Sequence, residues 1–411
     1  MNPKRNKVLI LAQSFIREKK DITSAYLFVL AQKIMSFGYD IEVLAPHQRG
    51  LRFFEKIEDI PIHRFRYSLD RYERLAYHGN MHELVKKSLL NKLIFIFFLF
   101  SFFWKALKLA AKEEIGLIHA HWWIPSGLVG ALVSRVVRKP LLVTTHGTDI
   151  MILPSSGSLR ILAGFVFGQA SNITVVSTFL KKKLLSTLPL PSSKIIVSSM
   201  PVDLDRFSLS EKKGVIEVSS EGKLKKRKSI LCVARYTKQK RLDTLINAVA
   251  LLREEGLDLE TILIGEGDEE KHLKRMIVDR ALSDRVILLP LMSQEKLSHY
   301  YRESDIVVLP SVDEGFGLVL VEAQLCQTPV IGADSGGIPD IIESEVTGLL
   351  FPPGNAQSLA YNIKRILTEK GLAKKLASTA CQTALTRFSP ETVARRFVNI
   401  YDGLVNKEKQ V

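Results

Sequence analysis

The chain has 411 residues, 46% of them hydrophobic, and a formal net charge of +15. This length predicts two or three domains and excludes a small disulfide-stapled scaffold, and the apolar content is too high for a disordered chain. The three cysteines form no CxxC motif and have no histidine at metal-ligand spacing, so neither a disulfide framework nor a zinc site is expected. Sparse cysteines fit a reducing compartment, and we expect a cytoplasmic protein.

The excess positive charge is confined to the first half of the chain. Residues 1–200 contain 28 Lys and Arg against 13 Asp and Glu, whereas residues 201–411 contain 30 of each kind. Such asymmetry suggests that the first half meets an anionic partner, which can be a membrane surface, an acidic ligand or nucleic acid. A merely solubilising surface is the alternative.

The first half alternates strand-like and helix-like segments. Strands rich in Val, Ile and Leu, as in parallel sheets covered on both faces, are predicted over residues 8–12, 41–45, 115–120, 141–145 and 173–177. Helices are predicted between them, over residues 24–37, 83–112, 126–137 and 178–185. This alternation predicts a doubly wound α/β domain over residues 1–203.

The hydrophobic run Leu93–Trp104 (LIFIFFLFSFFW) allows three interpretations. It is too short to cross a membrane alone, because a spanning helix needs about 20 residues. It can instead be a buried helix on a sheet, or a helix that lies in the membrane interface with its aromatic side chains in the lipid. Lys105, Lys108 and Lys112 follow at spacings that share one helical face, as the interfacial interpretation requires.

A polar, charge-rich segment over residues 204–228 is predicted to be an interdomain linker, followed by a second α/β domain over residues 229–388. Its strands are expected over 230–234, 261–264, 286–289, 306–309 and 330–332, and its helices over 242–255, 269–281, 294–303, 317–326 and 356–369. A C-terminal helix over residues 389–405 starts with Ser-Pro-Glu and is expected to pack back on the first domain.

The strongest functional signal is the run Asp313–Ala323 (DEGFGLVLVEA), which follows a predicted strand and opens a helix. Its two glycines let a ligand approach the backbone closely, and the helix start presents free N–H groups and a positive dipole end to an anion. A diphosphate is the natural occupant of such a site. Glu314 and Glu322 can accept hydrogen bonds from the hydroxyls of a sugar or a ribose.

This run resembles the Glu-x7-Glu signature of the retaining glycosyltransferases of family 4, which have the GT-B fold. The segments ADSGGIPDII (333–342) and GLLFPPG (348–354) are similar to the motifs that follow it in that family. In the first half, HAHW (119–122) and HGTD (146–149) resemble two strand-end motifs. The resemblance implies an α/β fold of two doubly wound Rossmann-like domains that face each other across a cleft.

The resemblance also implies roles for individual residues in the second domain. Arg235 and Lys240 resemble the family's Arg-x4-Lys pair, which would bind the donor diphosphate and stabilise the leaving group, so that both belong to the predicted catalytic set. The backbone N–H groups of Phe316, Gly317 and Leu318 would hold phosphate oxygens.

Two glutamates and three first-domain residues complete the predicted site. Glu322 would bind the ribose hydroxyls, and Glu314 would contact the hydroxyls of the donor sugar. His121 matches the family's first-domain histidine that faces this sugar, and together with Glu314 it completes the predicted catalytic set. His146 and Asp149 would position the sugar or the acceptor, because they follow the next strand at the edge where ligands of such sheets bind.

The activity implied by the resemblance is transfer of a hexose from a nucleotide diphosphate sugar to an acceptor hydroxyl, in the synthesis of a cell-envelope glycolipid or polysaccharide. Retention without an obvious nucleophile suggests same-face attack, with the donor phosphate accepting the proton. No cofactor and no metal are expected. A nucleotide-sugar epimerase, a glycogen-type phosphorylase and a non-catalytic basic binding module are the alternatives.

The charge of the first half predicts peripheral contact with an anionic membrane, at the inner face of the cell membrane, and a lipid-linked or anionic acceptor. Nucleic acid is not expected as a partner, because the basic residues are not interleaved with aromatic ones in a recognisable binding motif.

Overall fold

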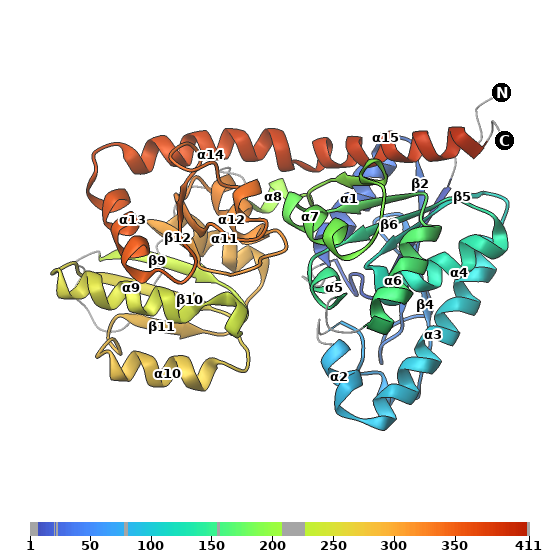
Figure 1. The fold of residues 1–411 in the computed structure, drawn as a ribbon, viewed down its shortest axis with the longest axis horizontal. Coiled ribbons are helices and arrows are strands. Elements are labelled where there is room, and N and C mark those ends of the chain that lie inside the picture. The colour runs from blue at the N-terminus through green and yellow to red at the C-terminus, as the bar shows by residue number, and fades with distance from the viewer. Residues whose placement is uncertain are drawn as a thin grey trace. The chain divides into compact units, whose positions relative to one another are not determined.

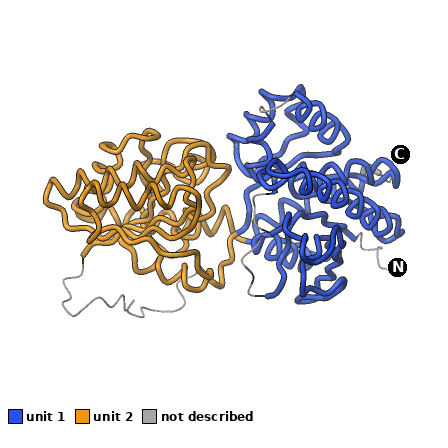
Figure 2. The backbone as a smooth tube through the Cα atoms, turned by 90° about the horizontal axis from the view of Figure 1, so that it is seen from below, with its two compact units in different colours: residues 1–201, 390–411 blue, residues 202–389 orange. Residues whose placement is uncertain are grey.

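The computed structural model describes residues 7–19, 21, 24–77, 81–153, 157–207 and 227–408 (Figure 1). The chain divides into two compact units, unit 1 with residues 1–201 and 390–411 and unit 2 with residues 202–389 (Figure 2). Each unit has one largely parallel sheet with helices packed on it. The predicted α/β class with two Rossmann-like domains is therefore confirmed.

Unit 1 is built on an eight-stranded sheet with the order β3-β4-β2-β1-β5-β6-β7-β8, in which only β3 and β4 pair antiparallel. Its strands are β1 (Lys7–Ala12), β2 (Asp40–Pro46), β3 (Phe54–Ile57), β4 (Ile60–Phe65), β5 (Ile115–His121), β6 (Leu141–Thr145), β7 (Asn172–Val175) and β8 (Ile195–Val197). Its helices are α1 (Ala25–Ser36), α2 (Met81–Lys87), α3 (Leu89–Ala110), α4 (Leu128–Val137), α5 (Thr148–Met151), α6 (Gly157–Gln169), α7 (Thr178–Thr187) and α15 (Pro390–Glu408). The central strands β1, β5 and β6 are almost completely buried, as their apolar runs predict.

The helix predicted over residues 83–112 is two helices, α2 and α3. Ser88 has an extended backbone and accepts a hydrogen bond from the Leu90 N–H at 3.2 Å, so it caps a new helix instead of continuing the old one. Ser177 likewise caps α7 through the Leu180 N–H at 3.3 Å, which ends β7 earlier than the apolar run suggests.

The C-terminal helix α15 is part of unit 1, where it packs on α1. Lys33 on α1 forms an ion pair with Glu391 at 2.7 Å. Tyr401 places its hydroxyl 2.7 Å from Nδ1 of His119 on β5, and both residues are buried. The last helix of the chain thereby closes the core of the first sheet.

Unit 2 has a six-stranded parallel sheet with the order β11-β10-β9-β12-β13-β14, in which the strand order reverses between β9 and β12. Its strands are β9 (Lys228–Val233), β10 (Leu259–Ile264), β11 (Val286–Leu289), β12 (Ile306–Leu309), β13 (Val330–Ala333) and β14 (Leu349–Phe351). Its helices are α8 (Leu204–Phe207), α9 (Leu242–Glu254), α10 (Glu270–Asp279), α11 (Gln294–Glu303), α12 (Leu318–Leu325), α13 (Ala356–Thr368) and α14 (Leu372–Phe388). Of the predicted linker 204–228, residues 208–226 lie outside the described residues.

Candidate active site

The loops after β9, β12 and β13 lie at one edge of the unit 2 sheet. These strands are parallel neighbours, so their carboxyl ends meet where the strand order reverses, which is the ligand-binding position of open α/β sheets. Arg235 and Lys240 follow β9, and the run beginning at Asp313 follows β12. The sheet topology therefore unites two motifs that are about eighty residues apart in sequence.

Lys240 and Glu314 form an ion pair, with 2.5 Å between Nζ and Oε2. Their side chains are only 14% and 15% exposed. The two opposite charges therefore offset each other in a largely buried position.

The loop that carries Glu314 is held by backbone and side-chain hydrogen bonds. Gln239 donates from Nε2 to the Asp313 carbonyl at 3.0 Å, and the Asp313 N–H donates to Oγ of Ser335 at 3.0 Å. Gly336 has φ +63°, and a Cβ at this position would overlap the backbone N and O of Glu314. Only glycine lets these two loops approach so closely.

Helix α12 starts directly at this loop, with Gly317 as its N-cap. Within the described chain, the N–H groups of Phe316, Gly317 and Leu318 have no hydrogen-bond acceptor. Free N–H groups and the positive end of the helix dipole favour an anion at this position.

Glu322 lies on α12, buried, and accepts a hydrogen bond from the Tyr301 hydroxyl at 2.8 Å. Burial raises the pKa of the Glu322 carboxyl to about 7, although the bond from Tyr301 acts in the opposite direction. Tyr301, on α11, is itself fully buried. Among the described residues the carboxylate therefore has one hydrogen-bond partner, and it retains capacity for hydroxyl donors.

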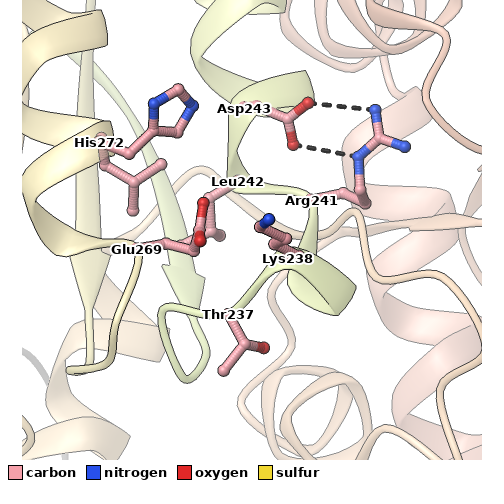
Figure 3. Close-up of a pocket in the computed structure, with 8 residues that line it drawn as sticks. Thr237, Lys238, Arg241, Leu242, Asp243, Glu269 and His272 are labelled. Atoms are coloured by element: carbon pink, nitrogen blue, oxygen red, sulfur yellow. Dashed lines mark hydrogen bonds and ion pairs between the residues drawn. The ribbon is translucent and has the colours of Figure 1, made fainter.

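Arg235 is exposed and has no ion-pair partner among the residues that the structure describes. A pocket of 340 Å³ lies beside the segment that links it to Lys240, between the starts of α9 and α10 (Figure 3). Arg241 at its wall pairs with Asp243 at 3.1 Å. The pocket walls include none of the predicted donor-binding side chains.

In unit 1, His121 ends β5, His146 directly follows the neighbouring strand β6, and the two rings lie in contact. Nδ1 of His121 is 3.1 Å from Nε2 of His146. The other ring nitrogen of His146, Nδ1, is 3.4 Å from the Tyr26 hydroxyl. Burial lowers the pKa of His121 well below its usual range and that of His146 to about 3, so both rings are neutral at pH 7. Nε2 of His121 is buried and has no hydrogen-bond partner among the described residues.

The Asp149 carboxylate organises the loop after β6. Its Oδ1 accepts from the N–H groups of His146, Gly147 and Ile150 at 2.9–3.1 Å, and Oδ2 accepts from Trp123 N–H at 3.3 Å. Burial raises the pKa of Asp149 to about 6, against the lowering effect of these donors. The structure thus makes Asp149 a positioning residue for His146.

One group of side chains in the described chain could hold a metal ion, and it includes none of the predicted site residues. It consists of His47, Asp70 and Glu73. Nδ1 of His47 is 2.7 Å from Glu73, Nε2 of His47 is 2.9 Å from the Leu51 carbonyl, and Asp70 pairs with Arg66. Both nitrogens of the histidine are therefore already engaged.

Gln239, Ser335, Tyr301 and Tyr26 support the two sites but are missing from the sequence prediction. Gln239 lies inside the Arg-x4-Lys segment and Ser335 lies inside the Gly-Gly loop, so their motifs offered a signal. Tyr301 and Tyr26 stand in ordinary helical patterns, and only the fold brings them to Glu322 and His146.

Two family descriptions match the chain. Glycosyltransferase Family 4 matches residues 23–206, and Glycosyl transferases group 1 matches residues 216–383. The N-acetyl-alpha-D-glucosaminyl L-malate synthase of Bacillus anthracis is 28% identical over 313 residues, which are 74% of this chain and 79% of that protein. The D-inositol 3-phosphate glycosyltransferase of Mycobacteroides abscessus is 31% identical over 283 residues, 64% of this chain and 62% of that protein.

Solved structures share the fold over nearly the whole chain. Sucrose-phosphate synthase of Thermosynechococcus elongatus has a TM-score of 0.78 at 21% identity and covers 98% of this chain and 100% of its own. Anabaena HepE, solved in complex with UDP-glucose, has a TM-score of 0.72 at 21% identity, with 97% of this chain and 100% of its own covered.

Proposed function

This chain belongs to the glycosyltransferases of family 4 with the GT-B fold, and we propose that it transfers a hexose with retention from a nucleotide diphosphate sugar to an acceptor hydroxyl. The observation that carries this proposal is the anion-binding edge of unit 2. There the free N–H groups at the start of α12 lie on the same loop as Glu314. The ion-pair partner of Glu314 is Lys240, which lies with Arg235 on the neighbouring loop.

The donor diphosphate binds at this edge and breaks the Lys240–Glu314 ion pair. Lys240 and the exposed Arg235 then donate charge-assisted hydrogen bonds to the phosphate oxygens. The released Glu314 carboxylate accepts hydrogen bonds from the sugar hydroxyls, while Glu322 accepts from the ribose. HepE, solved with UDP-glucose, supports a nucleotide-sugar donor.

During transfer, the bond between the anomeric carbon and the diphosphate oxygen breaks, and the acceptor oxygen bonds to the same face of the sugar. The acceptor proton moves to an oxygen of the departing diphosphate. Arg235, Lys240 and the α12 dipole stabilise the charge that develops there, and this scheme requires no metal ion. His121 contributes its free Nε2 to the donor sugar, and His146 and Asp149 hold that ring in place.

The acceptor belongs to unit 1 and is anionic or lipid-linked, in cytoplasmic synthesis of a cell-envelope glycolipid or polysaccharide. The positive charge of residues 1–200 favours an acidic acceptor. The names of two relatives contain L-malate and D-inositol 3-phosphate, both of which are anionic.

A donor screen followed by product analysis tests this function. Thermal shift with UDP-, GDP- and ADP-sugars identifies the donor, and mass spectrometry with NMR then identifies the product formed with candidate acceptors. We expect the wild type to transfer the sugar with retained anomeric configuration, and we expect Glu314→Ala to lose this transfer activity. An isomerised sugar formed from donor alone would instead assign an epimerase, and full transfer by Glu314→Ala would refute the role of this carboxylate.

A further inference from the structure

Helix α3 exposes a continuous apolar face on unit 1. Leu93, Phe97, Phe100 and Trp104 recur at spacings of four, three and four residues, which places them on one side of the helix. Each of these side chains is 54–62% exposed, and Leu89 at the start of the helix is 77% exposed. So much aromatic and aliphatic surface in one place marks an interaction site.

The opposite face of α3 belongs to the core of unit 1. Phe98 and Phe102 are fully buried, and Phe102 stacks on Phe65 of β4 with 4.4 Å between ring centroids. Helix α3 is the one helix in the described chain that is long and apolar enough to cross a membrane. If α3 crossed a membrane, its buried face would lose its contacts with the sheet. The helix can therefore meet lipid only by lying along the surface of the bilayer.

Free lysines surround the exposed face. Lys86 and Lys87 end α2, Lys92 lies in the first turns of α3, and Lys105 and Lys108 follow the aromatic residues. None of the five has an ion-pair partner in the described part of the chain. No acidic residue occurs between Ser88 and Lys112.

We propose that unit 1 docks on an anionic lipid bilayer through α3, with its apolar face at the acyl boundary and its lysines at the headgroups. A second copy of the chain fits less well, because two-fold pairing would bring the same lysines face to face. The inference deepens the proposed function, since a lipid-linked acceptor would be presented at this surface. The surface itself is argued from α3 alone.

Co-sedimentation of the full chain with vesicles tests the proposal. Wild type should bind phosphatidylcholine vesicles containing about one-third phosphatidylglycerol, bind pure phosphatidylcholine weakly, and dissociate at high salt. Phe97→Ser with Phe100→Ser should weaken binding by at least about tenfold through the lost apolar contact. Lys105→Gln with Lys108→Gln should weaken it about thirtyfold, at about 1 kcal/mol for each cation.

Val278→Ser with Tyr361→Ser is the matched control, because these side chains of unit 2 are 65% and 63% exposed but have no lysine-flanked apolar helix around them. It should bind vesicles as wild type does. Thermal shift with nucleotide sugars, measured on every variant, separates a loss of membrane docking from a loss of the donor site.

Equal binding of wild type to neutral and anionic vesicles, or wild-type binding by the Phe97/Phe100 variant, would overturn the proposal. It would also be overturned if wild type were a dimer that the Phe97/Phe100 variant converts to a monomer, because the face would then be covered by a second copy.

Discussion

Glu322 is a buried carboxyl group at the proposed donor site. Its carboxyl pKa is raised from 4.5 to about 7, because burial disfavours the charged form more than the Tyr301 hydroxyl stabilises it. In the unfolded chain the same group titrates near its usual pKa. The folded protein therefore binds this proton more tightly, and stability falls as the pH rises from about 4.5 to about 7.

Replacing Glu322 with Gln should stabilise the protein only where the wild-type carboxylate is charged. We expect Glu322→Gln to gain up to about 3 kcal/mol in the free energy of unfolding at pH 8, and no more than a small fraction of that at pH 5. Urea unfolding at both pH values measures this difference. The exposed Glu254→Gln is the control, and an identical gain at pH 5 and pH 8 would contradict the assignment.

His146 is expected to act through His121 and not on the substrate itself. His146→Leu leaves Nδ1 of His121 without a partner and should lower kcat about tenfold, because a buried unpaired polar group costs about 1–3 kcal/mol. His146→Gln keeps a hydrogen-bonding group there and should restore part of kcat. Steady-state kinetics with calorimetric donor affinities check this, and equal activity of the two variants would argue against a positioning role.

Residue types in motifs could be predicted from sequence, but their partners could not. Glu314 and Lys240 are recognisable separately, and their ion pair exists because β9 and β12 are neighbours in the sheet. Asp149 is expected to position the sugar or the acceptor, but the backbone N–H groups that its carboxylate accepts from could not be predicted. Side-chain orientation of this kind depends on the local path of the loop, which spacing does not encode.

At the scale of elements, the start of α12 depends on how closely the Gly-Gly loop approaches it. Gly336 fits against the Glu314 backbone only because it has no Cβ. Gly371, the N-cap of α14, also has a positive φ of +82° but open space around it. Substitutions at both glycines introduce the strain of a positive φ, but only a substitution at Gly336 would also displace the Glu314 loop.

Gly336→Ala should displace the Glu314 loop and weaken donor binding by at least about tenfold, a change of about 1.4 kcal/mol. Gly371→Ala carries only the conformational strain, about 1–2 kcal/mol of stability, and should leave donor affinity unchanged. Thermal melts and donor titrations on both variants provide the comparison. Equal donor affinity in the two variants would show that the close approach does not shape the site.

Apolar periodicity predicted most strands of both sheets, but strands β3, β4, β8 and β14 and helices α6 and α14 were not predicted. Strands β3, β8 and β14 have only three or four residues, which is too few to give a clear pattern, and the break at Ser88 interrupts a run that is helical on both sides. The exposure of α3 could not be decided from sequence, because a buried helix and an interfacial helix share the same composition.

At the scale of the whole molecule, charge and chemistry divide between the two halves of the chain. The excess positive charge lies in residues 1–200, which contain α3 and its lysines, whereas residues 201–411 are balanced and contain the anion-binding edge. Because the excess charge lies in the same half as α3, we expect salt to weaken the proposed membrane docking strongly. The proposed donor site has only two cations and a helix start, so donor binding should depend on salt much less.

Calorimetric titration of UDP, GDP and ADP into wild type and Arg235→Ala tests the central claim most directly. Arg280→Ala, which replaces another exposed arginine of unit 2, is the control. We expect one of the three nucleotides to bind wild type and Arg280→Ala equally, and to bind Arg235→Ala at least about tenfold more weakly, because a charge-assisted hydrogen bond is worth about 1.5–3 kcal/mol. Binding of none of them, or equal binding by Arg235→Ala, would contradict the assignment of this edge as the donor site.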